Sequence, residues 1–220
     1  MKIYRFNCSN DSPSDKAVMI LPGGGYKYVS VDGMEGSECA QFFNALGYDA
    51  IVVNYLTGEF EEVGFEDMIR RLKIVIKKVN IYSTFGLVGF SSGGHIAALC
   101  LNENISFGVI TYAPLDFSSK YNHEASLDYL KHATSTTAQN ILDISPKHQV
   151  TGSEPPVYIY HSILDLTVLA SQSQLMHTKL VEMGVKSTLF IAERGEHGAG
   201  INSYKWKENI TSFVNNFKTL

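Results

Sequence analysis

Cysteine is scarce in this sequence, and long apolar runs are absent from it. Cys8, Cys39 and Cys100 are the three cysteines among 220 residues, and their odd number argues against a disulfide framework. We therefore expect free thiols in a reducing, cytoplasmic setting, with Cys39 and Cys100 as small core residues. No stretch approaches the roughly 18 apolar residues that span a membrane, and residues 1–10 hold no signal-peptide core.

Charged residues are also few. They make up 18% of the chain, and the formal net charge is −4. Such a balance creates no broad attraction for nucleic acid or for an anionic membrane. The histidine, cysteine and acidic residues show no spacing typical of metal ligands. We therefore expect no metal and neither a nucleic-acid nor a membrane partner, and the oligomeric state stays open.

Short apolar runs alternate with amphipathic stretches along the whole chain. This alternation predicts a mostly parallel sheet with helices on both faces, in one α/β domain over residues 1–220. The carboxyl ends of such strands share one rim, where ligands bind. The predicted strands are 17–21, 49–55, 87–90, 108–112, 157–161 and 186–192. The predicted helices are 38–46, 65–79, 96–101, 168–183 and 201–217.

The segment 116–154 interrupts this alternation. It is polar, with helices predicted near 125–130 and 137–142. An insertion at the rim of the sheet would form a small cap or lid over a binding site. A surface excursion with no role in binding explains the same pattern, and the sequence does not separate the two interpretations.

The strongest chemical motif is G-x-S-x-G at residues 89–93. An apolar strand is predicted before it and a helix after it, which is the context of a nucleophile elbow. In such an elbow a sharp turn presents the serine at the rim, so Ser91 is the candidate nucleophile. Side chains at Gly89 and Gly93 would collide with the turn, which explains both glycines.

A serine needs a base to take its proton, and the base needs an acid to orient it. His197 follows the last predicted strand and lies on a glycine-flanked loop, so it is the candidate base; a solvated loop histidine is the alternative. Asp165 follows the strand 157–161 and is the candidate acid. Asp116 and Asp143 compete for that role but fall inside the inserted segment.

Backbone N–H groups should stabilise the oxyanion of such a reaction. One comes from Ser92, the residue after the nucleophile. Another comes from the glycine loop 22–26, which follows the first predicted strand. This loop lacks both the Lys-Ser/Thr of a phosphate-binding loop and the G-x-G-x-x-G spacing of a dinucleotide site, so a nucleotide cofactor is not expected.

From about Ile20 to Trp206 the chain resembles the acetyl xylan esterase-like α/β-hydrolases. The resemblance implies an α/β-hydrolase fold and cofactor-free hydrolysis of acetyl and other short acyl esters, often on sugars; the small cap insertion within 116–154 is expected from the polar segment alone. It also implies a Ser91, Asp165 and His197 triad, with the oxyanion donors on Gly24, Gly25 and Ser92. The motifs that carry it are Leu21-Pro22-Gly23-Gly24-Gly25-Tyr26, Glu35-Gly36-Ser37-Glu38, Gly47-Tyr48-Asp49-Ala50, Gly89-Phe90-Ser91-Ser92-Gly93-Gly94-His95, Ser145-Pro146 with Gln149-Val150-Thr151, Pro155-Pro156 with His161, and Gly195-Glu196-His197-Gly198.

Two other functions remain open. A serine peptidase uses the same fold and triad but commonly carries a gating domain, for which 220 residues leave no room. A non-catalytic binding protein would usually lack a member of the triad, and none is missing here. We also expect a small-molecule ester as partner and a preference for short acyl groups, with the ring of Tyr26 closing the acyl side of the oxyanion loop.

Overall fold

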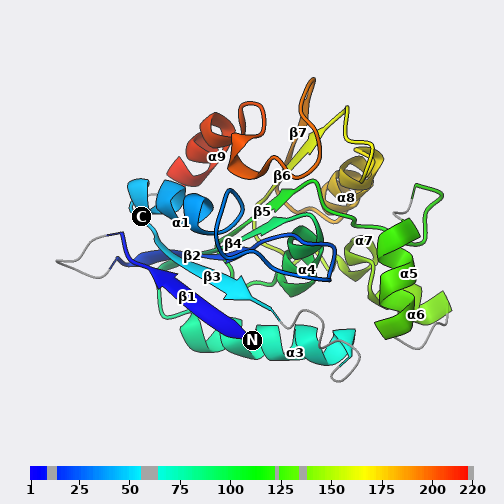
Figure 1. Ribbon diagram of the computed structural model, residues 1–220, viewed down its shortest axis with the longest axis horizontal. Helices are drawn as coiled ribbons and strands as arrows, with labels where there is room; N and C mark the ends of the chain where they lie inside the picture. Colours follow the sequence, from blue (N-terminus) through cyan, green and yellow to red (C-terminus); the bar gives the residue numbers. More distant parts are fainter. Residues whose placement is uncertain (9–13, 56–63, 122–123, 134–137, 218–220) are drawn as a thin grey trace.

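The computed structural model describes residues 1–8, 14–55, 64–121, 124–133 and 138–217. Seven strands in these ranges form one sheet in the order β1-β3-β2-β4-β5-β6-β7 (Figure 1). β1 is antiparallel to β3, and all other neighbouring strands are parallel. The predicted mostly parallel sheet is thus confirmed. The strands are β1 (Lys2–Phe6), β2 (Lys16–Leu21), β3 (Asp49–Asn54), β4 (Thr84–Phe90), β5 (Phe107–Thr111), β6 (Val157–Ser162) and β7 (Ser187–Ala192).

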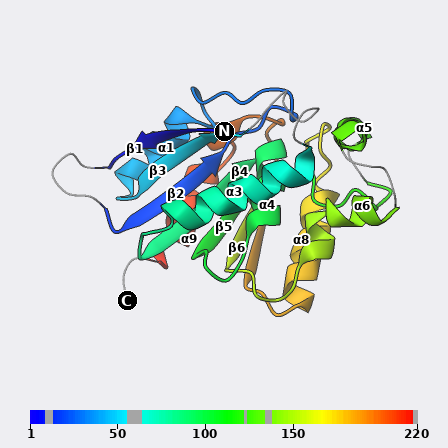
Figure 2. The same cartoon turned by 90° about the horizontal axis from the view of Figure 1, so that it is seen from below.

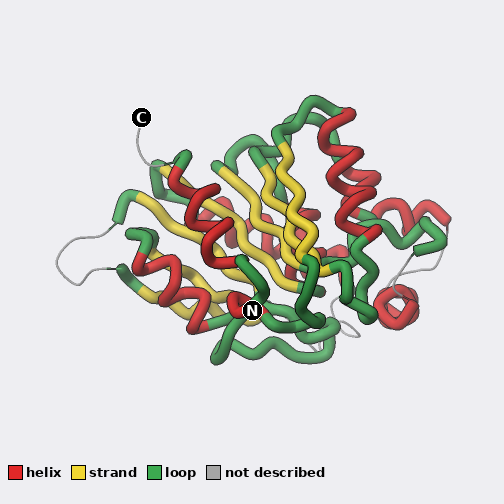
Figure 3. The backbone as a smooth tube through the Cα atoms, turned by 90° about the horizontal axis from the view of Figure 1, so that it is seen from above, coloured by secondary structure: helices red, strands yellow, loops and turns green. Residues whose placement is uncertain are grey.

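Helices cover both faces of this sheet. Figure 2 shows α3, α4 and α8 in front of one face, and Figure 3 shows α1 and α9 in front of the other. Among the described residues the helices are α1 (Ser37–Ala45), α3 (Phe65–Val79), α4 (Ser92–Cys100), α5 (Glu124–Ala133), α6 (Ala138–Asp143), α7 (Pro146–Gln149), α8 (Ser171–Glu182), the 3-10 turn η1 (Gly200–Asn202) and α9 (Trp206–Asn215). None of them is long and apolar enough to cross a membrane.

Alternate side chains of the central strands enter two different apolar layers. In β2, Met19 and Leu21 belong to the layer beneath α3, α4 and α8, whereas Val18 and Ile20 belong to the layer beneath α1 and α9. Successive strand residues point to opposite faces, so a sheet covered on both sides needs apolar residues at every position. This requirement explains why the strands read as continuous apolar runs.

The amphipathic pattern predicted α3 at its observed bounds, Phe65–Val79. Helix α8 begins at Ser171 rather than at residue 168, because the Val168 N–H donates to Oδ1 of Asp165 at 2.9 Å and holds the chain in a turn there. The predicted helix 201–217 is instead η1 followed by α9, with Lys205 between them in a left-handed conformation at φ 57°.

The segment 116–154 folds mainly into α5, α6 and α7 at one end of the molecule (Figures 1 and 2). The predicted helix 125–130 lies within α5. The predicted helix 137–142 corresponds to α6 from residue 138 onward, and residue 137 lies outside the described ranges. Asp116, at the start of the segment, is buried and bonded to Lys147 at 2.8 Å, which fixes the base of the insertion.

Candidate active site

Ser91 lies in the sharp turn between β4 and α4. Its backbone is in a strained conformation for a residue with a side chain, with φ 50° and ψ −123°. A Cβ atom at Gly89 would lie 2.6 Å from the carbonyl oxygen of Gly93, and one at Gly93 would lie 2.0 Å from that of Leu21. Neither contact is tolerable, so the turn requires glycine at both positions, as the motif predicted.

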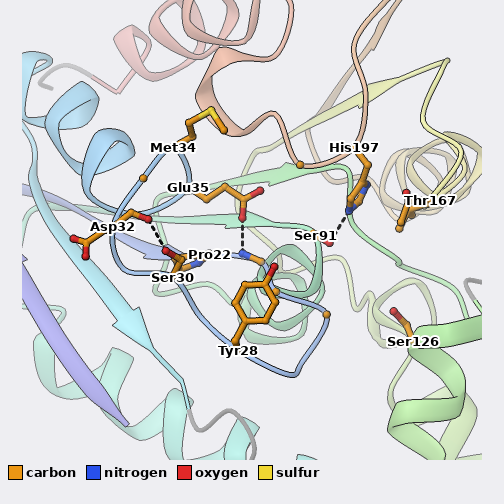
Figure 4. A pocket seen from close by; sticks show the side chains of 16 residues that line it. Pro22, Tyr28, Ser30, Asp32, Met34, Glu35, Ser91, Ser126, Thr167 and His197 are labelled. Atoms are coloured by element: carbon orange, nitrogen blue, oxygen red, sulfur yellow. Dashed lines mark hydrogen bonds between the residues drawn. The ribbon is translucent and has the colours of Figure 1, made fainter.

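The structure brings the three predicted side chains into one chain of hydrogen bonds. The Oγ atom of Ser91 is 2.9 Å from Nε2 of His197, and Nδ1 of His197 is 2.7 Å from Oδ2 of Asp165. Figure 4 shows the imidazole reaching down to Ser91 from the loop after β7. An ionised carboxylate only accepts, so Nδ1 of His197 carries the proton and Nε2 is free to accept from Ser91.

Asp165 is held as an anion. Burial alone would raise its pKa, but hydrogen bonds from His161 and His197, the charge of His197 and the Val168 N–H together hold the pKa well below its usual range. The His161 contact places Nε2 at 3.2 Å from Oδ2 of Asp165, and the same Nε2 is 2.7 Å from the Val168 carbonyl oxygen. His161 therefore orients the acid from behind.

The two competing aspartates lie elsewhere. Burial would raise the pKa of Asp116, but bonds from Lys147 and Ser118 outweigh it and lower that pKa, so this carboxylate is engaged within the insertion. Asp143 accepts a bond from Gln139 at 2.9 Å and lines a separate cavity between α3 and α7. The geometry thus favours Asp165 as the acid.

The glycine loop after β2 approaches the nucleophile closely. A Cβ atom at Gly23 would lie 2.9 Å from Cβ of Ser91. Gly24 and Gly25 have φ 138° and 60°, conformations that glycine adopts without strain, and both line the cavity together with Ser91. Ser92 opens α4, where backbone N–H groups lack helical partners. Gly24 and Gly25 therefore share the cavity with Ser91, and Ser92 follows Ser91 directly in the chain.

These groups face a cavity of about 560 Å³. Hydroxyl groups of Ser30, Ser126 and Thr167 lie in its wall, and Figure 4 shows Ser126 entering from α5, opposite the glycine loop. Asp32 and Glu35 bring carboxylates to it, and its described lining includes no Lys or Arg. In the part of the chain that the structure describes, no three His, Cys, Asp or Glu side chains could hold a metal ion.

Tyr26 does not take the predicted place, and that prediction is wrong. Its ring is fully buried, stacks on Tyr129 and meets Phe65 edge to face, and its hydroxyl lies 2.8 Å from Nδ1 of His95. Because this aromatic cluster absorbs the ring, the side chain is withdrawn from the cavity. Tyr28, two residues later and 65% exposed, lines the cavity instead.

Sequence reasoning assigned no role to two further residues beside the triad. Glu35 accepts a bond from the Gly23 N–H at 2.6 Å and one from the Tyr112 hydroxyl at 2.5 Å. That hydroxyl also accepts from the Gly200 N–H at 2.8 Å, and the Tyr112 ring lies 4.8 Å from the ring of His197. Glu35 stood out in the sequence only as part of a shared motif, without a chemical role.

A family model and curated proteins match this chain. The model of the prolyl oligopeptidase family matches residues 20–219. The acetylxylan esterase of Xylanibacter ruminicola is 23% identical over 221 residues, with 94% of this chain and 46% of that protein covered. The endo-1,4-beta-xylanase B of Butyrivibrio fibrisolvens is 25% identical over 213 residues, with 86% and 33% covered. The chain thus spans a third to under half of these relatives.

Solved structures share the fold. An acetyl ester-xyloside bifunctional hydrolase from Caldicellulosiruptor lactoaceticus aligns at a TM-score of 0.79 and 22% identity, covering 98% of this chain and 87% of that one. Esterase 2 of Thermogutta terrifontis, phosphonylated by sarin, aligns at 0.84 and 20%, covering 99% and 90%. The resemblance to acetyl xylan esterase-like α/β-hydrolases is confirmed, and the match over residues 20–219 shows that the chain belongs to the prolyl oligopeptidase family.

Proposed function

We propose that this protein hydrolyses carboxylic esters through an acyl-enzyme on Ser91. The observation that carries the proposal is the run of contacts from Asp165 through His197 to Ser91, at 2.7 Å and 2.9 Å, with the nucleophile on a strained turn beside the glycine loop. A serine in this position can lose its proton to the imidazole while it attacks, and the N–H groups opposite it can receive the oxyanion.

In the first half-reaction, Oγ of Ser91 bonds to the ester carbonyl carbon and its proton passes to Nε2 of His197. The N–H groups of Gly24, Gly25 and Ser92 stabilise the resulting oxyanion, and Asp165 stabilises the imidazolium. The intermediate collapses by breaking the bond to the alcohol oxygen, which takes the proton from His197. The alcohol leaves, and the acyl group remains on Ser91.

In the second half-reaction, water replaces the alcohol. His197 takes a proton from the water as its oxygen bonds to the acyl carbon, and the second oxyanion occupies the same donors. Collapse breaks the bond to Ser91, whose oxygen recovers the proton, and the carboxylic acid is released. Both halves use side chains and backbone groups of this chain alone, so no cofactor enters the scheme.

We propose acetyl or other short acyl esters of hydroxylated, sugar-like alcohols as substrates. The names of the relatives point this way, since two of those compared are called an acetylxylan esterase and an acetyl ester-xyloside hydrolase. The hydroxyl groups of Ser30, Ser126 and Thr167 in the cavity wall suit a polyol, because hydroxyl oxygens can accept hydrogen bonds from sugar hydroxyl groups.

Peptide hydrolysis is the second candidate, and the family match favours it. The same relay and oxyanion donors would act on a peptide bond, with the amine in place of the alcohol. A short peptide p-nitroanilide with proline before the scissile bond tests this candidate directly. Cleavage of the anilide at a kcat/KM above that of p-nitrophenyl acetate would replace the esterase proposal with a peptidase.

The ester proposal is tested by hydrolysis of p-nitrophenyl acetate, butyrate and octanoate. We expect kcat/KM to fall with chain length and Ser91→Ala to lose several orders of magnitude in kcat. Ser92→Ala is the matched control, because it changes the neighbouring side chain and keeps the backbone donor, so it should retain most activity. Mass spectrometry after fluorophosphonate treatment should show one adduct in the wild type and none in Ser91→Ala.

Two results contradict the proposal. Equal phosphonate labelling without Ser91 would move the nucleophile elsewhere, and a wild type that is inert toward both ester and anilide would make the protein a binding module. A rise in kcat/KM from acetate to octanoate would retain the esterase but replace the short-acyl pocket with an open apolar one, since each buried methylene contributes about 0.8 kcal/mol.

We further propose that the protein works in the cytoplasm. Cys8, Cys39 and Cys100 are all unpaired, and Cys39 and Cys100 are buried in the apolar layers. Free thiols persist in a reducing compartment. Fractionation of the source cells, followed by the phosphonate label, tests the location, and recovery of the labelled band outside the cytoplasmic fraction would contradict it.

A further inference from the structure

The loops that carry the proposed machinery meet at the partly buried side chain of Glu35. This residue precedes α1 and lies between the glycine loop and the loop that carries His197, as Figure 4 shows. Its two carboxylate oxygens accept from different loops, Oε2 from the Gly23 N–H at 2.6 Å and Oε1 from the Tyr112 hydroxyl at 2.5 Å. Each oxygen therefore fixes a different part of the site.

Tyr112 extends the connection to the loop that carries His197. Its hydroxyl oxygen accepts from the Gly200 N–H at 2.8 Å, so the chain of bonds runs from Gly23 through Glu35 and Tyr112 to Gly200. The fit is tight, because a Cβ atom at Gly23 would lie 2.9 Å from Oε2 of Glu35 and one at Gly200 would lie 3.2 Å from its Cγ.

The conformation of Tyr112 and the burial of the Glu35 carboxylate both reduce the stability of the folded protein, and folding alone does not explain them. Tyr112 has φ 39°, a strained conformation for a tyrosine. Burial raises the pKa of Glu35, and the bonds from Tyr112 and Gly23 and the charge of His197 only partly oppose this. A neutral side chain would fill the same space without that penalty. Strain and a shielded charge gathered beside a nucleophile are typical of a functional site.

We infer that Glu35 is a positioning residue that, through Tyr112, holds the glycine loop 22–26 and the loop that carries His197 in fixed positions relative to each other. The inference rests on the proposed esterase function. By engaging the Gly23 N–H, Glu35 orients the next peptide units, so that the N–H groups of Gly24 and Gly25 face the place where the oxyanion forms. Tyr112 sets the other side, since its ring packs against His197 while its hydroxyl holds Gly200.

The charge of Glu35 also acts on the imidazole. Four described ionisable groups face this carboxylate: Tyr112, Tyr55, Cys39 and His197. Burial raises the pKa of Tyr112, Tyr55 and Cys39, which keeps these three uncharged. His197 is therefore the facing group that gains a positive charge when it takes the proton of Ser91, and the Glu35 carboxylate attracts that charge.

The test compares Glu35→Gln with Glu38→Gln in the wild-type background. Glu38 is exposed in the first turn of α1, so its variant makes the same charge change away from the site. Glutamine at position 35 can still accept from Gly23, but it offers an N–H to Tyr112, whose hydroxyl loses its acceptor. We expect kcat on p-nitrophenyl acetate to fall about 10²-fold, as for loss of an oxyanion donor, with KM within about two-fold.

Two further readouts separate positioning from simple support of the fold. The melting temperature of Glu35→Gln at pH 7 should equal or exceed that of the wild type. Tyr112→Phe, which keeps the ring and removes the hydroxyl, should lower kcat to a similar extent.

These measurements distinguish failure of the inference about Glu35 from failure of the proposed esterase function. If the wild type hydrolyses the ester, Ser91→Ala does not, and both Glu35→Gln and Tyr112→Phe stay within two-fold of the wild type, the inference is overturned and the esterase stands. A loss of kcat in Glu35→Gln that accompanies a lowered melting temperature also overturns it. A wild type that neither hydrolyses the ester nor takes the phosphonate label overturns both proposals.

Discussion

The carboxylate of Asp165 is surrounded by donors on all sides. Oδ2 faces Nδ1 of His197 and Nε2 of His161, and Oδ1 accepts from the N–H groups of Thr167 and Val168 at 2.9 Å each. The side chain is therefore ionised and fixed in orientation before any substrate arrives. This is what a general base needs from its partner, since the imidazole must present Nε2, unprotonated, to the nucleophile.

Replacing Asp165 with asparagine exchanges one carboxylate oxygen for an amide nitrogen and so tests whether Asp165 orients His197. The amide nitrogen would donate where the carboxylate accepted, so His197 would favour the tautomer with its proton on Nε2, facing Ser91. We expect kcat for p-nitrophenyl acetate to fall by as much as about 10⁴-fold while the circular dichroism spectrum stays unchanged. Asp143→Asn is the control, and a collapse there with near-normal activity in Asp165→Asn would reassign the acid.

Single-residue features of the site differ in how far the sequence predicts them. Ser91 and Asp165 each follow a strand closely in the sequence. The glycine pattern of residues 89–93 and the order of the strands were therefore enough to predict both residues. His161 ends a predicted strand near the rim, which suggests a place at the site but favours no helper role, and Glu35 has no local mark of a chemical role. Glu35 acquires its role through a bond to Tyr112, 77 residues away, which exists only once three loops are assembled.

At the scale of elements, α4 and the inserted segment are connected through His95. Nε2 of His95 lies 2.7 Å from the carbonyl oxygen of Ile144, and its ring stacks on Phe65 and meets Phe117 edge to face. Burial lowers the pKa of His95 to about 4, only partly opposed by the Ile144 contact. The helix behind the nucleophile is thus tied to the base of α7 by a neutral imidazole.

This connection should make stability depend on pH. The unfolded chain protonates His95 near its ordinary pKa of 6.5, whereas the folded protein does so near 4. The unfolded state alone takes up this proton between those values, so the free energy of unfolding is undiminished above pH 6.5 and falls toward pH 4, by about 3 kcal/mol at most. Urea unfolding of His95→Gln should show a shallower decline over that window.

Tyr26→Phe is the comparison for this measurement. It removes the hydroxyl beside Nδ1 of His95 and leaves the imidazole, so the decline between pH 6.5 and 4 should persist. An identical pH dependence in the wild type and His95→Gln would rule out His95 as its source. The two variants together separate the protonation of the ring from the loss of one hydrogen bond.

Helix and strand positions followed from the sequence wherever a buried stripe or run was present. The stripe of α3 predicted both of its ends, whereas α8 and α9 begin later than expected because side chain-backbone bonds and a left-handed Lys205 shape the preceding turns. β1 was not predicted, since four of its five side chains are exposed and the strand exists through pairing with β3.

At the scale of the whole molecule, the cavity carries negative charge from Asp32 and Glu35, and no Lys or Arg is found in its described lining. Each carboxylate a few ångströms from an anionic substrate costs on the order of 1 kcal/mol at an intermediate effective dielectric. We therefore expect the cavity to take neutral or cationic esters in preference to anionic ones. Acetylated sugars without acidic groups satisfy that condition.

The selection is measurable with two matched esters, p-nitrophenyl hemisuccinate and its neutral methyl ester. They share the succinyl chain and differ in one charge and one terminal methyl group, so we expect kcat/KM to be roughly ten-fold lower for the anion at low ionic strength. The difference should narrow as salt is added, since exposed charges are screened. A ratio near one, or a ratio that salt does not change, would argue against this electrostatic selection.

Part of the cavity wall consists of residues outside the relay, although Ser91 and His197 also line the cavity. Tyr28, Met34 and Ser126 line the opening and lie apart from the contacts that join Asp165, His197 and Ser91. Substitutions at these wall positions can therefore accumulate, in evolution or in a laboratory library, without producing an inactive variant at any step. Successive substitutions in the cavity wall should therefore change which ester is preferred, while the strained turn at Ser91 stays unchanged.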